Sequence, residues 1–338
     1  MVTLSLPDGY TMRPLAREDA EGMIALLGAN AAAMGDPLEN TLEDVLREMA
    51  DPDLNLAHDT RAVFTPDGRL IAYSVAWATG RPALPIVEVF LHSSEWETDT
   101  VTERVLLDWA EDRVRENLAS LPPDMRVAMQ AFSDVRETRY LAILADAGFR
   151  SIRHSFQMGI TFDSPPEPPR WPEGFTLHVA QEDDVVPVFD ALRDAWRDHF
   201  GYIEEPYDER LAAWRHHWQE TFAPGLWFTG MAGDTVAGLC LCDPSFGGDE
   251  TTGFVSILGV RRAYRRRGLA EALLRHAFVT LYAAGRRSVL LYVDGASPTG
   301  ATRLYERAGM TARKRFTRVE KELRPGIDPS ALVADPAS

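Results

Sequence analysis

The second half of the chain shows hydrophobic spacings typical of both strands and helices. Apolar residues recur at intervals of three and four from Leu269 to Leu281, which indicates a helix with one buried face. The run Phe254–Val260 is almost continuously apolar, which is typical of a central strand buried on both faces. The pattern predicts strands at 176–179, 226–232, 235–242, 253–260, 288–293 and 311–320, and helices at 184–200, 207–221, 268–283 and 299–308. This mixed order predicts an α/β or α+β domain with helices covering a mixed central sheet.

A proline-rich stretch divides the chain. Residues 163–174 contain five prolines, which cannot donate to a sheet ladder and which push their neighbours into extended conformations. The last fifteen residues have three prolines and no apolar periodicity, so we expect them to be loose. We therefore predict a first domain at 1–163, a linker at 164–174, a second domain at 175–323 and a loose tail at 324–338.

Three short patterns of the first half recur in the same order in the second half, 161 to 166 positions later. A nearly constant offset over this length predicts a tandem duplication of a whole domain rather than a solenoid of short repeats. The length of 338 residues also fits two domains. The matching pairs are Leu15–Asp19 with Val179–Asp183, Leu70–Val75 with Val236–Leu241, and Ala147–Phe149 with Ala308–Met310.

The composition is that of an ordinary globular chain, with 45% hydrophobic and 25% charged residues. The two cysteines, Cys240 and Cys242, alternate in an apolar stretch, so we expect both thiols on one face of a strand as small buried hydrophobes. Neither a disulfide framework nor a catalytic cysteine is indicated.

The net charge of −16 is unevenly distributed. Up to Pro169 there are 14 arginines, no lysine and 28 acids, whereas the remainder has 21 bases and 23 acids. An acidic chain repels nucleic acid. The sequence also has no uninterrupted run of eighteen apolar residues and no basic, then apolar, N-terminal leader. We therefore expect a cytoplasmic protein that binds neither nucleic acid nor membrane.

The loop between the central strand and the following helix contains five arginines. The strand ends at Val260, the arginines lie between Arg261 and Arg267, and Gly268 opens the helix. Such a junction aims free backbone N–H groups and the positive end of the helix dipole at one point. A pyrophosphate suits this arrangement, because two linked phosphates accept several charge-assisted hydrogen bonds at once.

The segment Arg265–Ala270 resembles the Gln/Arg-x-x-Gly-x-Gly/Ala signature of the GNAT superfamily of acyl-CoA-dependent N-acyltransferases. Two later segments, Val289–Asp294 and Ala301–Met310, are similar to the fifth strand and the Ala-x-x-Leu-Tyr helix of that family. The resemblance covers about 150 residues of the second half and the first half only faintly. It implies two tandem GNAT-like domains, the second catalytic, with acetyl-CoA as co-substrate and no metal.

The resemblance also implies site residues. The backbone of the central strand would bind the pantetheine arm as an added strand, and the loop amides would bind the pyrophosphate. Tyr305 matches the family tyrosine near the sulfur and would donate a proton to the leaving thiolate; the alternative is a core aromatic residue. The implied cofactor-binding residues are Leu258, Gly259, Val260, Arg265, Arg266, Arg267, Gly268, Leu269 and Ala270.

Two positions depart from the family pattern. Pro298 stands where many relatives have an asparagine that contacts the cofactor. Phe254 stands where the tandem members that make mycothiol have a glutamate base, which weakens an assignment as a mycothiol synthase. The general base would then be Glu250, or Asp249, acting through water, unless the amine loses its proton to solvent. Both carboxylates also fit a plain polar turn.

The end of the first helix of the second copy borders the acceptor pocket in the family. Trp196, His199, Tyr202 and Glu204, with Glu205, would hold a cationic amine by ion pairing and cation–π contact. The alternative is a solvated helix end. Metal ligation by His199, His216 and His217 is not expected, because adjacent histidines point to different faces of a helix.

The equivalent loop of the first copy is different. Residues Val89–Asp99 contain no glycine and three acids, and Leu144 stands in the place of Tyr305. We therefore predict that the first copy does not bind CoA and serves as a scaffold or as one wall of the acceptor site.

The leading hypothesis is an acetyl-CoA-dependent N-acetyltransferase that acts on a small cationic primary amine by direct attack on the thioester. One alternative is a catalytically silent CoA-binding or interaction protein; another is nucleic-acid binding through the arginine loop. The oligomeric state stays open, and a monomer is compatible with two copies that form a pseudo-dimer.

Overall fold

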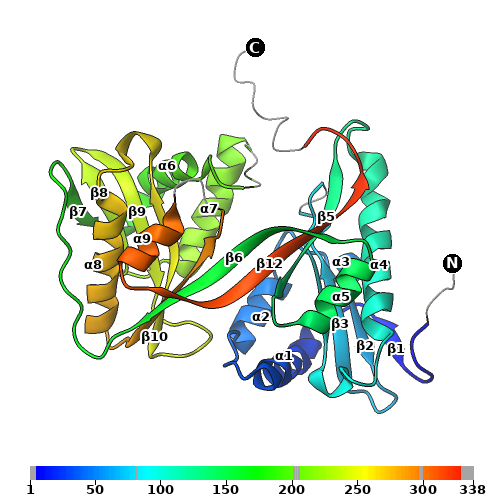
Figure 1. Ribbon diagram of the computed structural model, residues 1–338. Coiled ribbons are helices and arrows are strands. Elements are labelled where there is room, and N and C mark those ends of the chain that lie inside the picture. The colour runs from blue at the N-terminus through cyan, green and yellow to red at the C-terminus, as the bar shows by residue number, and fades with distance from the viewer. Residues whose placement is uncertain are drawn as a thin grey trace. The chain divides into compact units, whose positions relative to one another are not determined.

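A computed structural model describes residues 5–80, 83–200, 202, 204, 206–296 and 300–328. The chain forms two compact units (Figure 1). Unit 1 comprises Met1–Arg153 and Phe316–Ser338, and unit 2 comprises His154–Arg315.

Apart from the short helix α3 of unit 1, the elements of the two units follow the same order, which confirms the tandem duplication. In unit 1 they are β1 (Thr11–Arg13), α1 (Ala20–Met34), α2 (Leu42–Met49), α3 (Leu56–Asp59), β2 (Thr60–Phe64), β3 (Leu70–Ala76), β4 (Val87–Leu91), α4 (Thr102–Glu116), β5 (Val127–Asp134) and α5 (Thr138–Asp146). In unit 2 they are β7 (Thr176–Val179), α6 (Val185–Trp196), α7 (Tyr207–Thr221), β8 (Trp227–Ala232), β9 (Thr235–Asp243), β10 (Thr252–Val260), α8 (Leu269–Ala283), β11 (Ser288–Asp294) and α9 (Ala301–Arg307). Two long strands, β6 (Arg150–Thr161) and β12 (Thr311–Arg324), close the two halves of the sequence.

The sheet of unit 1 is antiparallel from β1 to β4. Strand β5 runs parallel to β4, and the bridge between Ile86 and Gln130 joins it to the chain just before β4. One core packs α4 and α5 against β3, β4 and β5, and a second packs α1 and α2 against β2 and β3. Helices therefore cover both faces of the sheet.

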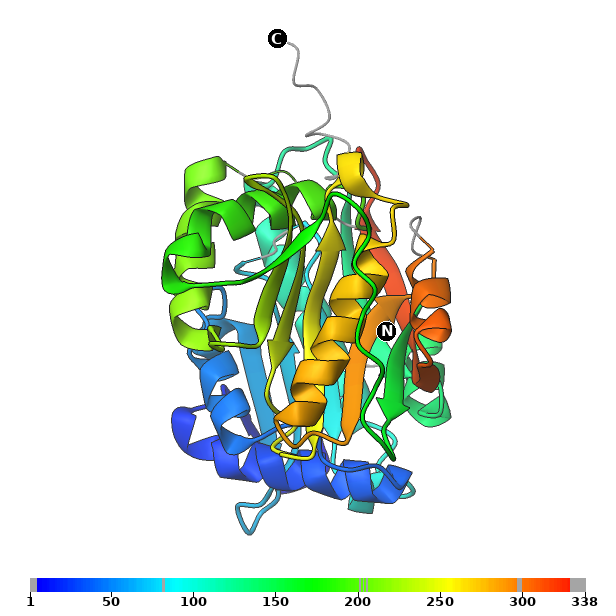
Figure 2. The same ribbon diagram turned by 90° about the vertical axis from the view of Figure 1, so that its left-hand side faces the viewer.

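The sheet of unit 2 has the order β7, β8, β9, β10, β11, β6. Its only parallel pair within the described residues is β10 with β11. Helix α8 packs its apolar face on one side of this sheet, and α6 and α7 pack on the other. Figure 2 shows α8 lying along the strands. The predicted α/β fold with a mixed central sheet is confirmed, and so is the burial of Cys240 and Cys242, whose sulfurs lie 3.8 Å apart.

The division into units differs from the boundaries expected from the sequence. Residues 164–174 are irregular, as their prolines predict, but they lie within unit 2. Strand β6 pairs with β11 from Ser155 to Thr161, and β12 pairs with β5 from Phe316 to Arg324. Hydrogen-bonded partners, rather than chain order, therefore define each unit.

The predicted loose tail begins later than expected. Arg324 is the last residue of β12, and Ile327 is held on both sides, because its N–H donates to Asp124 O (2.7 Å) and its carbonyl accepts from Arg126 N (2.8 Å). Residues 329–338 lie outside the described residues. No helix in the described part of the chain combines the length and apolar character needed to cross a bilayer.

Candidate functional site

The parallel strands β10 and β11 separate in the middle of β10. They pair from Thr252 with Ser288 to Phe254 with Leu290, and the pairing ends there. On its other edge β10 has a register shift against β9 between Val255 and Ile257. A bulge of this kind bends a strand and increases its twist, so it turns the second half of β10 away from β11.

The separated half of β10 presents unpaired backbone groups. Arg261 N donates to Ala237 O (2.9 Å), so alternation directs the backbone groups of Gly259 and Ile257 toward β9 as well. The N–H and C=O groups of Leu258 and Val260 therefore point to the open edge. Arg265 Nε donates a hydrogen bond to the carbonyl of Val260 (2.9 Å), so this oxygen already has a partner. Among the described residues, no strand pairs with the N–H and C=O groups of Leu258 or with the N–H of Val260. This edge can therefore accept an extended amide chain.

The loop after β10 ends in an uncapped helix N-terminus. Arg266 and Gly268 both have left-handed backbone conformations, with φ of +61° and +83°. Gly268 is the N-cap residue of α8 and provides no side-chain cap. The first N–H groups of α8 thus stay available for an anion, and the helix dipole adds partial positive charge there.

The five arginines of the loop are not equivalent. Arg262 and Arg265 both bind the carboxylate of Asp198, and they lower the pKa of that group to about 2. Arg261 Nε lies 3.3 Å from Asp194 Oδ2. Arg267 lies over the ring of Phe175, 4.4 Å from its centroid. Arg266 is exposed and has no ion-pair partner among the described residues, so it is the arginine most available to a phosphate.

Tyr305 is brought to the place where the strands separate. It is 6% exposed, and burial, followed by the proximity of Cys240, raises the pKa of its phenol. Cys240 is the β9 partner of Leu258, so the phenol lies near the open half of β10. A phenol with a raised pKa keeps its proton at neutral pH and can donate it.

The expected acceptor residues lie together at the end of α6. Trp196 and His199 stack with centroids 4.6 Å apart, and a Cβ on Gly259 would lie 2.7 Å from the Trp196 ring. Tyr202 donates to Glu204 Oε2 (2.9 Å). Glu204 also pairs with Arg193 and lies 3.7 Å from Arg197, so its carboxylate is already neutralised. Glu205 lies outside the described residues.

The candidate bases lie in the turn before β10. Asp249 accepts hydrogen bonds from Thr251 and Thr252, which lower its pKa. Glu250 is exposed in the same turn. The turn adjoins the half of β10 that is still paired with β11, so neither carboxylate is brought to the open edge.

A cluster of aromatic rings at the separation point was not predicted from the sequence. Phe254 lies 4.9 Å from Phe246 and 5.8 Å from Tyr292, measured between centroids, and Tyr292 is 44% exposed. The tyrosine hydroxyl accepts a hydrogen bond from Gln157 (3.1 Å). The one sequence signal for this cluster is that Phe254 and Tyr292 lie in two predicted strands. If these strands are adjacent, the two rings can share one face of the sheet. Pro298 lies outside the described residues, which hold no group of three or more potential metal ligands.

Comparisons with known proteins bear on the family and the fold. Residues 188–310 match the model of the acetyltransferase (GNAT) family. The chain is 31% identical to a GCN5-related N-acetyltransferase from Sphaerobacter thermophilus, over 96% of this chain and 99% of that one, with a TM-score of 0.81. A tandem GNAT protein from the clavulanic acid biosynthesis pathway is 15% identical over 94% and 100% of the two chains (TM-score 0.71). N-myristoyltransferase from Saccharomyces cerevisiae shares the fold at 11% identity over 96% and 81% (TM-score 0.60). No curated protein matches the sequence significantly.

Proposed function

The chain belongs to the GNAT family of acetyltransferases, and on this premise we propose that unit 2 transfers an acetyl group from acetyl-CoA to the nitrogen of a small cationic primary amine. The observation that carries the proposal is the separation of β10 from β11 directly before an uncapped helix N-terminus. The two features suit the two polar parts of acyl-CoA, its amide-containing arm and its pyrophosphate.

The described residues fit this co-substrate. The amides of the pantetheine arm would bond to the backbone groups of Leu258 and to the N–H of Val260. The pyrophosphate would accept from the N–H groups of Gly268, Leu269 and Ala270 and from the guanidinium of Arg266. Arg265 has a supporting role, since its guanidinium binds Val260 O, Ala195 O and Asp198.

The chemistry needs a neutral amine and a proton donor. The amine nitrogen attacks the thioester carbonyl, a C–N bond forms, and the C–S bond breaks as sulfur leaves as a thiolate. Tyr305 donates its proton to that sulfur and is reprotonated from solvent. The amine loses its own proton to solvent, because the turn with Glu250 and Asp249 adjoins the half of β10 that is still paired with β11.

The aromatic surroundings support a cationic acceptor. Trp196 lies against Gly259, and Tyr292 lies edge-on to Phe254, so both rings adjoin the open half of β10; rings of this kind attract ammonium groups. Glu204 would bind the ammonium group of the substrate in place of the guanidinium of Arg193.

Thiol release from acetyl-CoA, measured with a panel of amines, tests the proposal. We expect turnover with at least one cationic amine and an amide product heavier by one acetyl group. Tyr305→Phe should lower kcat by about 10²- to 10⁴-fold, the range of general acid catalysis, and leave the acetyl-CoA Kd within about twofold. Tyr282→Phe, at the far end of α8, is the matched control and should keep full activity.

Two results would contradict the proposal. Tight binding of acetyl-CoA without turnover on any amine would favour a catalytically silent CoA-binding protein. Faster turnover of neutral or anionic amines than of cationic ones would contradict the acceptor class.

A further inference from the structure

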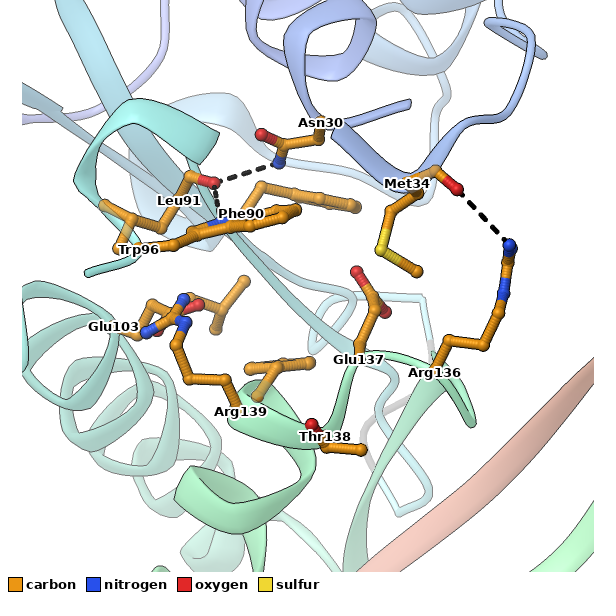
Figure 3. A pocket seen from close by; sticks show the side chains of 12 residues that line it. Asn30, Met34, Phe90, Leu91, Trp96, Glu103, Arg136, Glu137, Thr138 and Arg139 are labelled. Atoms are coloured by element: carbon orange, nitrogen blue, oxygen red, sulfur yellow. Dashed lines mark hydrogen bonds and ion pairs between the residues drawn. The ribbon is translucent and has the colours of Figure 1, made fainter. Parts of the chain in front are cut away.

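Unit 1 contains a cavity of about 210 Å³ that the proposed function does not use. It lies among the C-terminal half of α1, strand β4, the start of α4 and the start of α5. Figure 3 shows the rings of Phe90 and Trp96 on one side and the side chains of Glu103, Glu137 and Arg139 facing them. The cavity thus combines an aromatic wall with carboxylates.

Asn30 and Tyr140 belong to the wall of this cavity. Asn30 donates through Nδ2 to Leu91 O (2.9 Å), which fixes its side chain beside Leu91. Tyr140 is 8% exposed, and its hydroxyl lies near the amide of Val89. Both side chains are therefore held by the wall itself, and the carboxylates are the polar groups that remain for a ligand.

The carboxylates exceed their cationic partners. Glu103 is 5% exposed and pairs with Arg139 (2.5 Å). The hydrogen bonds that Glu137 accepts from Ser133 Oγ (2.8 Å) and Asp134 N (3.3 Å) both go to Oε2, and Figure 3 shows its carboxylate pointing toward Phe90 and Met34. The nearby Arg136 pairs with two other acids, Asp134 and Asp36. One carboxylate therefore faces the cavity without a counter-ion of its own.

Burial raises the pKa values of both Glu103 and Glu137. A raised carboxyl pKa means that the charged form is poorly solvated, and a bound cation would stabilise it. The aromatic rings of Trp96 and Phe90 would stabilise the same cation through their faces.

The cavity does not suit CoA. The helix N-terminus beside it is capped by the chain itself, since Asp99 Oδ1 accepts from the N–H groups of Val101 (2.9 Å) and Thr102 (2.8 Å). A phosphate group of CoA at this helix N-terminus would be repelled by the carboxylates of Asp99 and Glu103. The volume is also below the roughly 300–1,000 Å³ of pockets for drug-sized ligands.

We propose that the cavity of unit 1 is a binding site for a small organic cation, with the ammonium group against Glu137 and the apolar body against Trp96 and Phe90. All of the lining residues belong to unit 1, so the proposal stands independently of catalysis in unit 2.

Calorimetric titration of the full chain with three probes of similar shape tests this: phenethylammonium, neutral 2-phenylethanol and anionic phenylacetate. We expect phenethylammonium to bind at least about tenfold more tightly than either of the others. Glu137→Gln keeps the shape of the side chain and should weaken binding of the cation by about tenfold or more, with little effect on the alcohol. Trp96→Phe should weaken it by about threefold to tenfold through loss of the larger ring.

Variants of unit 2 provide the control for cation binding at the acceptor site. Glu137→Gln should weaken the binding of phenethylammonium, whereas Trp196→Phe and Tyr305→Phe should leave this affinity unchanged. Circular dichroism should show that each variant is folded. Equal affinity for the cation and the alcohol, or cation binding insensitive to both Glu137→Gln and Trp96→Phe, would overturn the proposal. A second acetyl-CoA per chain that is lost in Trp96→Phe would overturn it in favour of CoA.

Discussion

The junction between a central strand and the next helix is built twice in this chain, with opposite results. In unit 1, Asp99 stands two residues before Val101, the N-cap of α4, and its carboxylate accepts hydrogen bonds from the N–H groups of Val101 and Thr102. In unit 2, Arg266 stands two residues before Gly268, the N-cap of α8, and it points into solvent. The same backbone donors are therefore used internally in one copy and left for a ligand in the other.

The strand before each junction changes less. Strand β10 pairs with its parallel neighbour over three residues, and the segment leading into β4 is joined to β5 by a single bridge, so both copies open a sheet edge. The opening is thus common to both copies, whereas the side chains around it differ.

The largest expected effect on acetyl-CoA binding comes from replacing Arg266 of unit 2 by aspartate, the residue type that unit 1 has at Asp99. Arg266→Asp removes one charge-assisted contact worth about 1.5–3 kcal/mol and adds a carboxylate beside the pyrophosphate. We expect the acetyl-CoA Kd to rise by about 100-fold or more, measured by titration calorimetry. Arg266→Asn, which tolerates positive φ, should raise it by about tenfold.

Arg17→Asp makes the same charge change at an exposed site of unit 1 and is the matched control. If Arg17→Asp and Arg266→Asp weaken binding equally, net charge rather than the local cradle governs affinity, and the contrast between the two junctions fails.

The next effect concerns the helix of unit 1. Asp99→Ala removes the cap of α4, which typically costs about 1 kcal/mol. This should lower the Tm of the first unfolding transition by about 2–4 °C in calorimetry. The stoichiometry should stay at one acetyl-CoA per chain, because Glu103 and the small cavity remain. Two acetyl-CoA molecules per chain, in the wild type or in this variant, would contradict the assignment of the first copy.

The smallest effect concerns the ion pairs behind the arginine loop. The folded-state pKa of Asp198 is depressed to about 2, so its stabilising contribution is present above its ordinary value near 4 and is lost as pH falls toward 2. The pair is partly exposed, so Asp198→Asn should lower the free energy of unfolding at pH 7 by less than about 1 kcal/mol. Denaturant titrations of both proteins should converge as the pH approaches 2; a difference that grows there would refute the assignment.

Local patterns in the sequence predicted most of unit 2. The predictions of a strand at β10 and a helix at α8 are confirmed. They succeeded because burial determines where the apolar residues of each element lie. The first helix was expected to continue to Phe200 but ends at Trp196, where His199 N bonds to Trp196 O and Asp198 turns to the arginine loop. These contacts are tertiary, so no local pattern records them.

Two features of the sites could not have been read from the sequence. The ion pairs that occupy Arg261, Arg262 and Arg265 join residues about 65 positions apart. The cavity of unit 1 gathers Asn30, Trp96 and Tyr140 from three separate elements. The Asp99 cap, by contrast, could have been anticipated, since an aspartate shortly before a helix is a common capping signal.

Strands β6 and β12 have a practical consequence for anyone who wishes to express one copy alone. A single cut in residues 164–174 leaves the first fragment without the β12 segment that pairs with β5, and it leaves the second fragment without the β6 segment that pairs with β11. Each fragment would expose a strand edge, a template for aggregation. A gene that encodes either copy alone would therefore need the missing strand grafted back.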